Sequence, residues 1–150
     1  MYHGKEHNKL LHRNVATLRP LSKALYVSMN PANLKKFVEK EIEEYIYFVP
    51  DDAVGNKIND AWIKDQLSQA KACIVEPYLE KMWLQDTYEQ VKNKTEKNTQ
   101  ELWVVADDKE MFKVFYDPQN KEFGLANFKC AELTMTIGIR GDFVGCFMAR

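Results

Sequence analysis

Residues 92–100 read Lys-Asn-Lys-Thr-Glu-Lys-Asn-Thr-Gln and contain no hydrophobic side chain. The spacing of apolar residues changes across this stretch, from the three-and-four spacing of helices before it to the alternation of strands after it. We therefore interpret residues 92–100 as a polar connector between a helical part and a β part. Residues 101–150 need a helical layer over one face of their sheet to be stable, so we expect both parts to belong to a single domain spanning residues 1–150.

The clearest helix before the connector begins at Asn30 and Pro31. Asparagine caps exposed backbone amides, and proline fits the first helical turn, where its missing N–H costs nothing. Apolar residues then follow one helical face as far as Val49, and Pro50 ends the pattern. That face consists of Leu34, Phe37, Val38, Ile42, Tyr45, Ile46 and Val49. A second amphipathic helix is predicted over residues 58–74.

Residues 72–91 allow two interpretations. Apolar residues continue at helical spacing, which favours two consecutive helices that meet at Pro77. The alternative is a buried strand over residues 72–76, because the residue before a proline prefers an extended backbone. Upstream, residues 1–9 are polar and predicted to be a flexible tail. Residues 10–29 combine a short helix before Pro20 with a turn of helix or a strand near residues 24–29.

After the connector the pattern predicts strands. Turn-forming residues separate short apolar or alternating runs, which is typical of antiparallel hairpins. The predicted strands are residues 102–106, 111–116, 122–126, 133–139 and 143–149. Arg140-Gly141-Asp142 is interpreted as the hairpin turn before the last strand. The predicted fold class is therefore α+β, with three to four N-terminal helices packed on a C-terminal antiparallel β-meander of about five strands.

The composition argues against several function classes. The formal net charge of −1 supplies no field that would recruit nucleic acid or an anionic membrane. No stretch approaches the roughly 18 apolar residues of a membrane span. The cysteines, Cys73, Cys130 and Cys146, are odd in number and widely separated, which is typical of a cytoplasmic protein rather than a disulfide scaffold.

Two features of residues 1–23 suggest chemistry and have plainer explanations. His3 to His7 spell H-x-x-E-H, a zinc-binding signature, but the motif contains Gly4 and lacks the apolar residues of a buried helix. Cations also outnumber acids here: Lys5, Lys9, Arg13, Arg19 and Lys23 stand against Glu6. Such an arm can touch phosphate, which makes salt-sensitive nucleic-acid binding a third functional hypothesis. A solvated terminal tail explains both features.

Acid clusters elsewhere are read mainly as structural. Pro50-Asp51-Asp52, with Gln69-Ala70-Lys71 downstream, resembles the acid and lysine arrangement of the restriction-type nuclease core. That core requires its acids on adjacent strands around Mg²⁺. The helical reading of both regions instead makes Pro50-Asp51-Asp52 a helix stop. Glu41, beside the apolar face of the first helix, is read as a side chain at the edge of the core.

No catalytic residue, metal ligand or cofactor is predicted. The sequence contains no G-x-S-x-G, phosphate-binding loop, dinucleotide fingerprint or paired C-x-x-C. Gly138 and Gly145 are read as strand glycines, where the backbone bulges or is approached closely. Aromatic residues are numerous enough either to fill a core or to line a pocket between helices and a curved sheet. They include Trp62, Trp83, Trp103, Phe112, Phe115, Tyr116 and Phe123.

These observations favour a small, cytoplasmic, non-enzymatic protein-binding module. Residues 115–124, Phe-Tyr-Asp-Pro-Gln-Asn-Lys-Glu-Phe-Gly, resemble hairpins of bacterial toxin and immunity proteins, which makes an immunity or antitoxin-like role the specific hypothesis. The alternative is a small-ligand-binding protein or enzyme with a pocket between helices and sheet. A homo-oligomer formed through an edge strand, either residues 102–106 or residues 143–149, is a further prediction.

Overall fold

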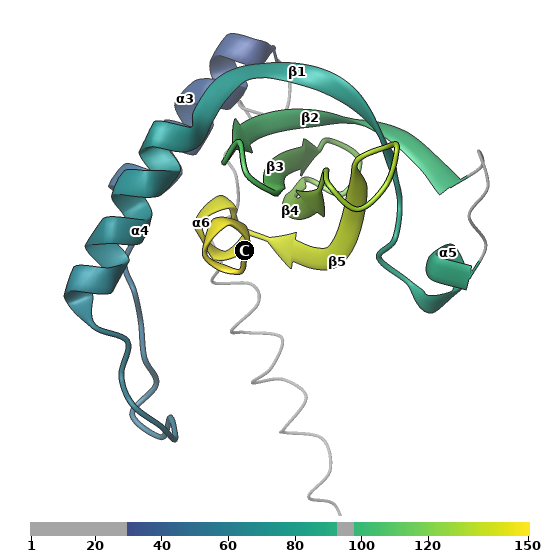
Figure 1. Ribbon diagram of the computed structural model, residues 1–150. Helices are drawn as coiled ribbons and strands as arrows, with labels where there is room; N and C mark the ends of the chain where they lie inside the picture. The colour runs from purple at the N-terminus through teal and green to yellow at the C-terminus, as the bar shows by residue number, and fades with distance from the viewer. Residues whose placement is uncertain (1–29, 93–97) are drawn as a thin grey trace, which may run out of the picture. The chain divides into compact units, whose positions relative to one another are not determined.

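The computed structural model describes residues 30–92 and 98–150, and Figure 1 shows how their helices and strands are arranged. Contacts divide the chain into two units, Met1–Asn30 and Pro31–Arg150, and all described residues except Asn30 belong to the second. The predictions for residues 1–29, including the tail, the histidine motif and the basic arm, lie outside the described residues. A single domain spanning residues 1–150 stays a prediction.

The first described helix, α3, spans Pro31–Glu43 and buries Leu34, Phe37, Val38 and Ile42. Its start is the predicted one, but its end is six residues earlier than the predicted end at Val49. The residues after Glu43 explain the early end. Tyr45 to Val49 are aromatic or β-branched and lose side-chain freedom in a helix. The acids Glu43 and Glu44 also oppose the helix dipole at its C-terminal end.

The second long helix runs directly into a strand. Helix α4 spans Asp60–Cys73, and the side chain of Asn59 caps it by accepting from the Ala61 amide at 2.7 Å. Strand β1, Ile74–Trp83, follows with no loop between them. The preference for two consecutive helices across residues 72–91 was therefore wrong over β1. The β-branched pair Ile74 and Val75, followed by Pro77, favours the extended chain.

Five strands form a closed barrel in sequence order. After β1 and the short helix α5, Tyr88–Lys92, they are β2, Thr99–Asp107; β3, Phe112–Asp117; β4, Glu122–Asn127; and β5, Met135–Gly141. Neighbours from β1 to β5 pair antiparallel, so the predicted α+β class with a five-stranded antiparallel sheet is confirmed. A register shift between Ile74 and Tyr78 brackets Pro77, which has no N–H to give the ladder.

The barrel closes where the end of β1 meets the start of β5. Trp83 and Met135 pair in parallel, and the Trp83 amide donates to the Thr134 carbonyl at 2.9 Å. Beyond that pair, the loop after β1 forms the hydrogen bonds to β5. The Gln85 amide donates to Thr136 Oγ1 at 2.7 Å, and the Gly138 amide donates to Asp86 Oδ1 at 3.1 Å. Side chains thus complete a closure that the strands make over only one residue pair.

The last element differs from its prediction. Residues 143–149 were expected to form the closing strand, but Phe143–Met148 is a short helix, α6. Arg140, Gly141 and Asp142 are accordingly not a hairpin turn: Gly141 ends β5, and Asp142 caps α6 by accepting from the Gly145 amide at 3.2 Å. Gly145 therefore lies in a helix rather than in a strand. The sheet still has five strands, because β1, which was not expected to be a strand of the sheet, joins the other four.

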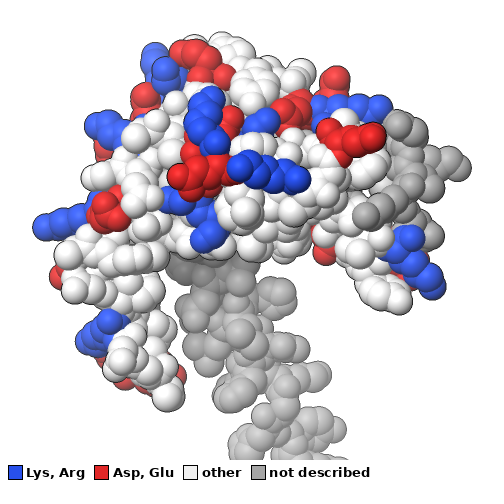
Figure 2. Space-filling view, in the orientation of Figure 1, with Lys and Arg blue, Asp and Glu red and all other residues white. Residues whose placement is uncertain are grey.

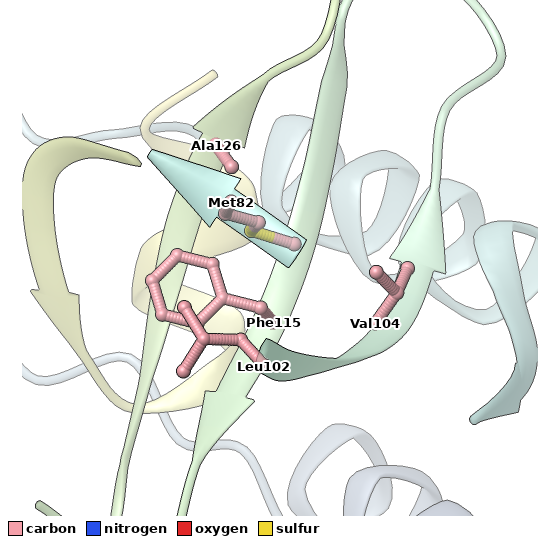
Figure 3. Close-up of a cluster of buried hydrophobic side chains, with 5 residues drawn as sticks. All are labelled: Met82, Leu102, Val104, Phe115 and Ala126. Atoms are coloured by element: carbon pink, nitrogen blue, oxygen red, sulfur yellow. The ribbon is translucent and has the colours of Figure 1, made fainter. Parts of the chain in front are cut away.

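Two apolar cores stabilise this unit. The barrel interior is filled by a cluster of Met82, Leu102, Val104, Phe115 and Ala126, whose side chains are drawn in Figure 3. On the outside, aromatic rings join α3, α6 and the sheet: Phe123 stacks on Phe37 at 5.6 Å and meets the edge of Phe143 at 5.7 Å between ring centroids. Adjacent residues of one strand serve different cores, because successive side chains point to opposite faces.

Candidate functional site

The longest connection between two described elements is the segment joining α3 to α4. We call residues 44–59 the α3–α4 arm; it extends from the lower ends of the two helices in Figure 1. Ile46 is 79% exposed, Phe48 is 80% exposed, and Val54 is fully exposed. Ile58 and Trp62, the latter in the first turn of α4, are also exposed. Single exposed apolar residues are common, but several large ones in one short segment make that segment a candidate interaction surface.

Few hydrogen bonds hold the arm in place. The Ala53 amide donates to the Pro50 carbonyl at 3.0 Å, which forms a turn at the tip, and Asn59 starts α4. Pro50, Asp51 and Gly55 are residues that favour turns. The arm leaves α3 where apolar residues at helical spacing could have continued the helix. The sequence placed Ile46 and Val49 on the buried helical face, but Ile46 is exposed and Val49 is half-buried.

The apolar side chains of the arm have mainly acidic neighbours. Glu43 ends α3, and Glu44 begins the arm and lies 3.9 Å from Lys40. Asp51 and Asp52 lie at the tip of the arm, and Asp60 begins α4. Lys57 is the cation within the arm. Figure 2 shows this part of the surface, at the lower left, as mostly uncharged with a few charged side chains on it. The arm thus exposes apolar side chains beside charged residues, more of which are acidic than basic.

The strongest charged cluster is at the closure of the barrel and is structural. Arg140 of β5 donates from Nη1 to Asp117 Oδ2 and from Nη2 to Asp86 Oδ2, each at 2.7 Å. Its guanidinium also lies 5.2 Å from the ring centroid of Phe115. Asp117 is completely buried and accepts further bonds from the backbone amides of Gln119 and Asn120. With every charge paired, this cluster ties β3, β5 and the loop after β1 together.

Burial and hydrogen bonding act in opposite directions on Asp117. Burial alone would raise the pKa of its carboxyl, but the hydrogen bonds donated by Arg140, Asn120 and Gln119 outweigh that effect and leave the pKa below its ordinary value. The carboxylate is therefore charged at neutral pH. A group held in this state by an arginine is suited to positioning the chain rather than to exchanging protons with a substrate.

A second ion pair lies between β1 and β3. Lys113 Nζ donates to Glu80 Oε1 at 2.7 Å and lies 5.1 Å from the ring centroid of Phe128. Burial alone would lower the pKa of Lys113, but its contact with Glu80 raises it above the ordinary value. The amine stays protonated, so it is not prepared to act as a nucleophile.

The thiols of Cys73 and Cys146 are not activated either. All three cysteines are free, and Cys146 is buried in α6, where burial raises its pKa to about 12. Burial likewise raises the pKa of Cys73. Cys130 is exposed. A reactive cysteine needs a lowered pKa, so Cys73 and Cys146 are structural thiols.

A shallow hollow of about 240 Å³ lies between α3 and α4. Its walls are Glu39, Ile42, Glu43 and Lys71. This volume is below the usual range of a ligand pocket, and the side chains that line it are mostly charged. Four of the aromatic residues proposed to line a pocket between helices and sheet have other positions. Phe115 fills the barrel, Tyr116 and Phe123 pack under the helices, and Trp62 is exposed.

The remaining predicted site residues are not brought together. Asp51 and Asp52 are exposed in the arm, whereas Gln69, Ala70 and Lys71 belong to α4, so the two acids lack the adjacent strands that a nuclease core requires. Glu41 is half-buried on α3, as expected for the edge of the core. Residues 102–106 lie in β2, paired on both sides, and residues 143–148 are helical. Neither is the free edge strand predicted for oligomer formation.

Sequence reasoning missed the α3–α4 arm, although a signal was present. Residues 45–49, Tyr-Ile-Tyr-Phe-Val, are aromatic or β-branched throughout, a composition more typical of strands than of helices. Their apolar spacing nevertheless fits the helical face of α3, and the helical pattern was preferred. The prediction therefore placed Ile46 on a buried face, whereas it is exposed in the structure.

Across residues 30–92 and 98–150, no group of three or more His, Cys, Asp and Glu side chains is arranged to hold a metal ion. No helix in that part of the chain has both the length and the apolar character needed to cross a membrane. Comparison with known proteins finds no family model, no curated protein and no solved structure that matches the chain.

Proposed function

We propose that this chain is a non-enzymatic protein-binding module whose contact surface is the α3–α4 arm. The observation that carries the proposal is the exposure of Ile46, Phe48, Val54, Ile58 and Trp62 within one short stretch of sequence. Burying such side chains against a partner removes apolar area from water, which is the main driving force of protein association.

The rest of the described molecule supports this division of roles. The two cores and the paired charges give a rigid body, and the arm extends from it with few internal hydrogen bonds. Binding residues are commonly carried on loops that a stable scaffold positions. The charged groups of the body that are most buried are neutralised by each other, which favours a structural role for them over catalysis.

In its narrower form, the proposal is that the partner is a toxin and that this chain has an immunity or antitoxin-like role in the cytoplasm. Its support is the resemblance of residues 115–124 to toxin and immunity hairpins, a stretch that folds as the β3–β4 hairpin. Free cysteines are compatible with a reducing compartment. Co-expression with a toxin encoded beside this chain's gene would test this form: survival that depends on Phe48 supports it.

The broader proposal is tested by affinity capture from the source organism's lysate with the tagged full chain. The double variant Ile46→Ser/Phe48→Ser removes apolar area from the arm, and Leu79→Ser is the matched control, because Leu79 is 50% exposed on β1, outside the arm. We expect one stoichiometric partner that the wild type and the control retain and the double variant loses. A partner retained by all three proteins would place the contact elsewhere, and an empty capture would favour the ligand-pocket alternative.

A further inference from the structure

The first limb of the arm has the side-chain pattern of a strand without a neighbour. We call residues 45–49 the β-forming segment. The exposed fractions of its side chains alternate: Ile46 is 79% exposed, Tyr47 36%, and Phe48 80%, and Val49 is half-buried. Alternation with a period of two is the pattern of a strand with one open face. The residue types in this segment are also those enriched in strands.

The backbone of the segment has no partner within the described part of the chain. Neither the amides nor the carbonyls of Ile46, Tyr47, Phe48 and Val49 form a hydrogen bond there. Backbone groups in an unpaired, exposed, β-forming segment can pair with another strand. Many protein contacts form in this way, with main-chain bonds giving affinity and alternate side chains giving specificity.

We propose that the β-forming segment binds its partner by strand addition, pairing with the exposed edge of a β-sheet in another protein. This inference rests on the proposed protein-binding function and specifies its mode. In the complex, one row of alternate backbone groups bonds to the partner's edge strand. Ile46 and Phe48 pack together on one face of the new pair and lose their contact with water.

The charges beside the segment indicate which edge it fits. Acids lie at both ends: Glu43 and Glu44 before it, with Glu44 3.9 Å from Lys40, and Asp51 and Asp52 after it. Exposed edge strands commonly carry lysine, which discourages unwanted pairing with other edges. Acidic ends match such lysines, whereas they repel an edge that carries carboxylates. The partner is therefore a protein with a lysine-bearing edge strand.

A second copy of this chain fits less well. The described barrel closes between β1 and β5 at one residue pair, and the loop after β1 bonds to β5 beyond it. Pro77 interrupts the N–H groups of β1, so little free strand edge is left for a second copy. Two β-forming segments could pair with each other, but antiparallel pairing centred on Tyr47 brings Asp51 of one copy next to Glu43 of the other. Pairing centred on Phe48 brings Asp52 next to Glu44. Like charges directly opposite each other destabilise a strand pair, and an isolated two-stranded ribbon is marginal in water.

The probe for this mode is a set of short synthetic strands of alternating threonine and valine, flanked either by lysines or by glutamates. Each is added to the full chain labelled with nitrogen-15, and amide hydrogen exchange is followed by NMR. With the lysine-flanked strand, alternate amides of residues 46–49 should exchange at least about tenfold more slowly. The glutamate-flanked strand should bind at least about tenfold more weakly, with the difference shrinking in high salt.

Methylating the backbone nitrogens of the probe separates strand addition from simple apolar contact. Methyl groups on one edge of the probe should abolish binding, and the same number on the other edge should leave it unchanged. The variant Phe48→Ser should weaken binding, and Leu79→Ser should not. If Phe48→Ser weakens binding but methylation of neither edge does, strand addition is wrong and the proposed protein-binding function stands.

Two other outcomes would also overturn strand addition. The first is that no lysine-flanked strand binds; the lysate capture with the Ile46→Ser/Phe48→Ser variant then decides the proposed function separately. The second is that the full chain sediments as a dimer that Phe48→Ser converts to a monomer. That result would assign the segment to a second copy of the chain.

Discussion

At the scale of single residues, Arg140 is the cation that neutralises two carboxylates, Asp117 and Asp86. It bonds both Asp117 and Asp86 at 2.7 Å and lies over the ring of Phe115. Arg140→Met keeps much of the aliphatic contact but leaves the fully buried Asp117 without its counter-charge. We expect the free energy of unfolding to fall by about 3–5 kcal/mol. Urea unfolding measures this change; Lys129→Met, at an exposed lysine, should stay within about 0.5 kcal/mol of the wild type.

Asp117 gives this cluster a defined pH dependence. The pKa of its carboxyl is lower in the folded chain than in the unfolded chain, where it is about 3.9. The unfolded state therefore binds a proton more readily, and the stabilisation is complete above about pH 4 and lost as the pH falls through the folded-state pKa. We expect Asp117→Asn to destabilise the protein most at pH 7 and progressively less below pH 4. A constant difference between the two proteins at all pH values would contradict this assignment.

Gly124 marks the closest approach of a backbone to a ring in the barrel. A Cβ atom at this position would overlap the Phe115 ring, and Phe115 is paired with Gly124 across β3 and β4. Gly124→Ala should therefore destabilise the fold by about 1–3 kcal/mol, as overpacking does. Chemical unfolding of Gly124→Ala, Phe115→Leu and the double variant tests the cause. If the clash with the ring is responsible, the double variant should be more stable than the sum of the single effects predicts.

At the scale of elements, residues 75–83 show why helix and strand were confused. Their apolar residues recur at helical spacing, yet Tyr78 and Leu79 are exposed in β1 while Pro77 and Met82 are buried. The helical interpretation placed Tyr78 and Leu79 on a buried face, but both are exposed. The better signals were local: a β-branched pair and a proline that forces its predecessor to be extended. Short apolar segments cannot be assigned by periodicity alone.

The ends of the chain's elements were predicted better where a specific residue sets them. Pro31 begins α3, and the turns at Asp107-Asp108 and Asp117 separate β2, β3 and β4 as expected. Residues 143–149 were misread because they are apolar throughout, which fits a buried strand as well as a buried helix. Asp142, an N-cap residue directly before that run, was the helix signal. The arm was missed because its exposure depends on where α3 stops.

The cap of α6 makes a prediction at this scale. Asp142 Oδ1 accepts from the Gly145 amide at 3.2 Å, and the helix it starts buries Phe143 and Phe147. Asp142→Ala should cost about 1 kcal/mol of stability, because an orphan amide loses its acceptor. Asp142→Asn keeps an oxygen at the cap and should retain most of that stability. Thermal unfolding of both variants tests the cap; equal losses would show that the charge, rather than the cap, is what matters.

At the scale of the whole molecule, stability and binding rest on different residues. The cores are built by the barrel, α3 and α6, whereas the exposed apolar residues of the arm contribute little to either core. We therefore expect Ile46→Ser/Phe48→Ser to change the free energy of unfolding by less than about 0.5 kcal/mol. Differential scanning calorimetry of the unliganded full chain measures this. A large loss of stability would mean that these side chains support the fold, and any loss of binding would then need another explanation.

The division of the chain at residue 30 leads to a prediction about folding. The unit Pro31–Arg150 contains every strand of the barrel and the aromatic contacts that join α3 and α6 to it. It has about the size at which one domain commonly folds alone. A fragment of residues 30–150 should therefore unfold cooperatively and keep slow amide exchange in β2, β3 and β4.

Hydrogen exchange, measured on the fragment and on the full chain, tests this prediction. Loss of protection throughout the barrel in the fragment would show that residues 1–29 are part of the same folding unit, as the prediction of one domain over residues 1–150 requires.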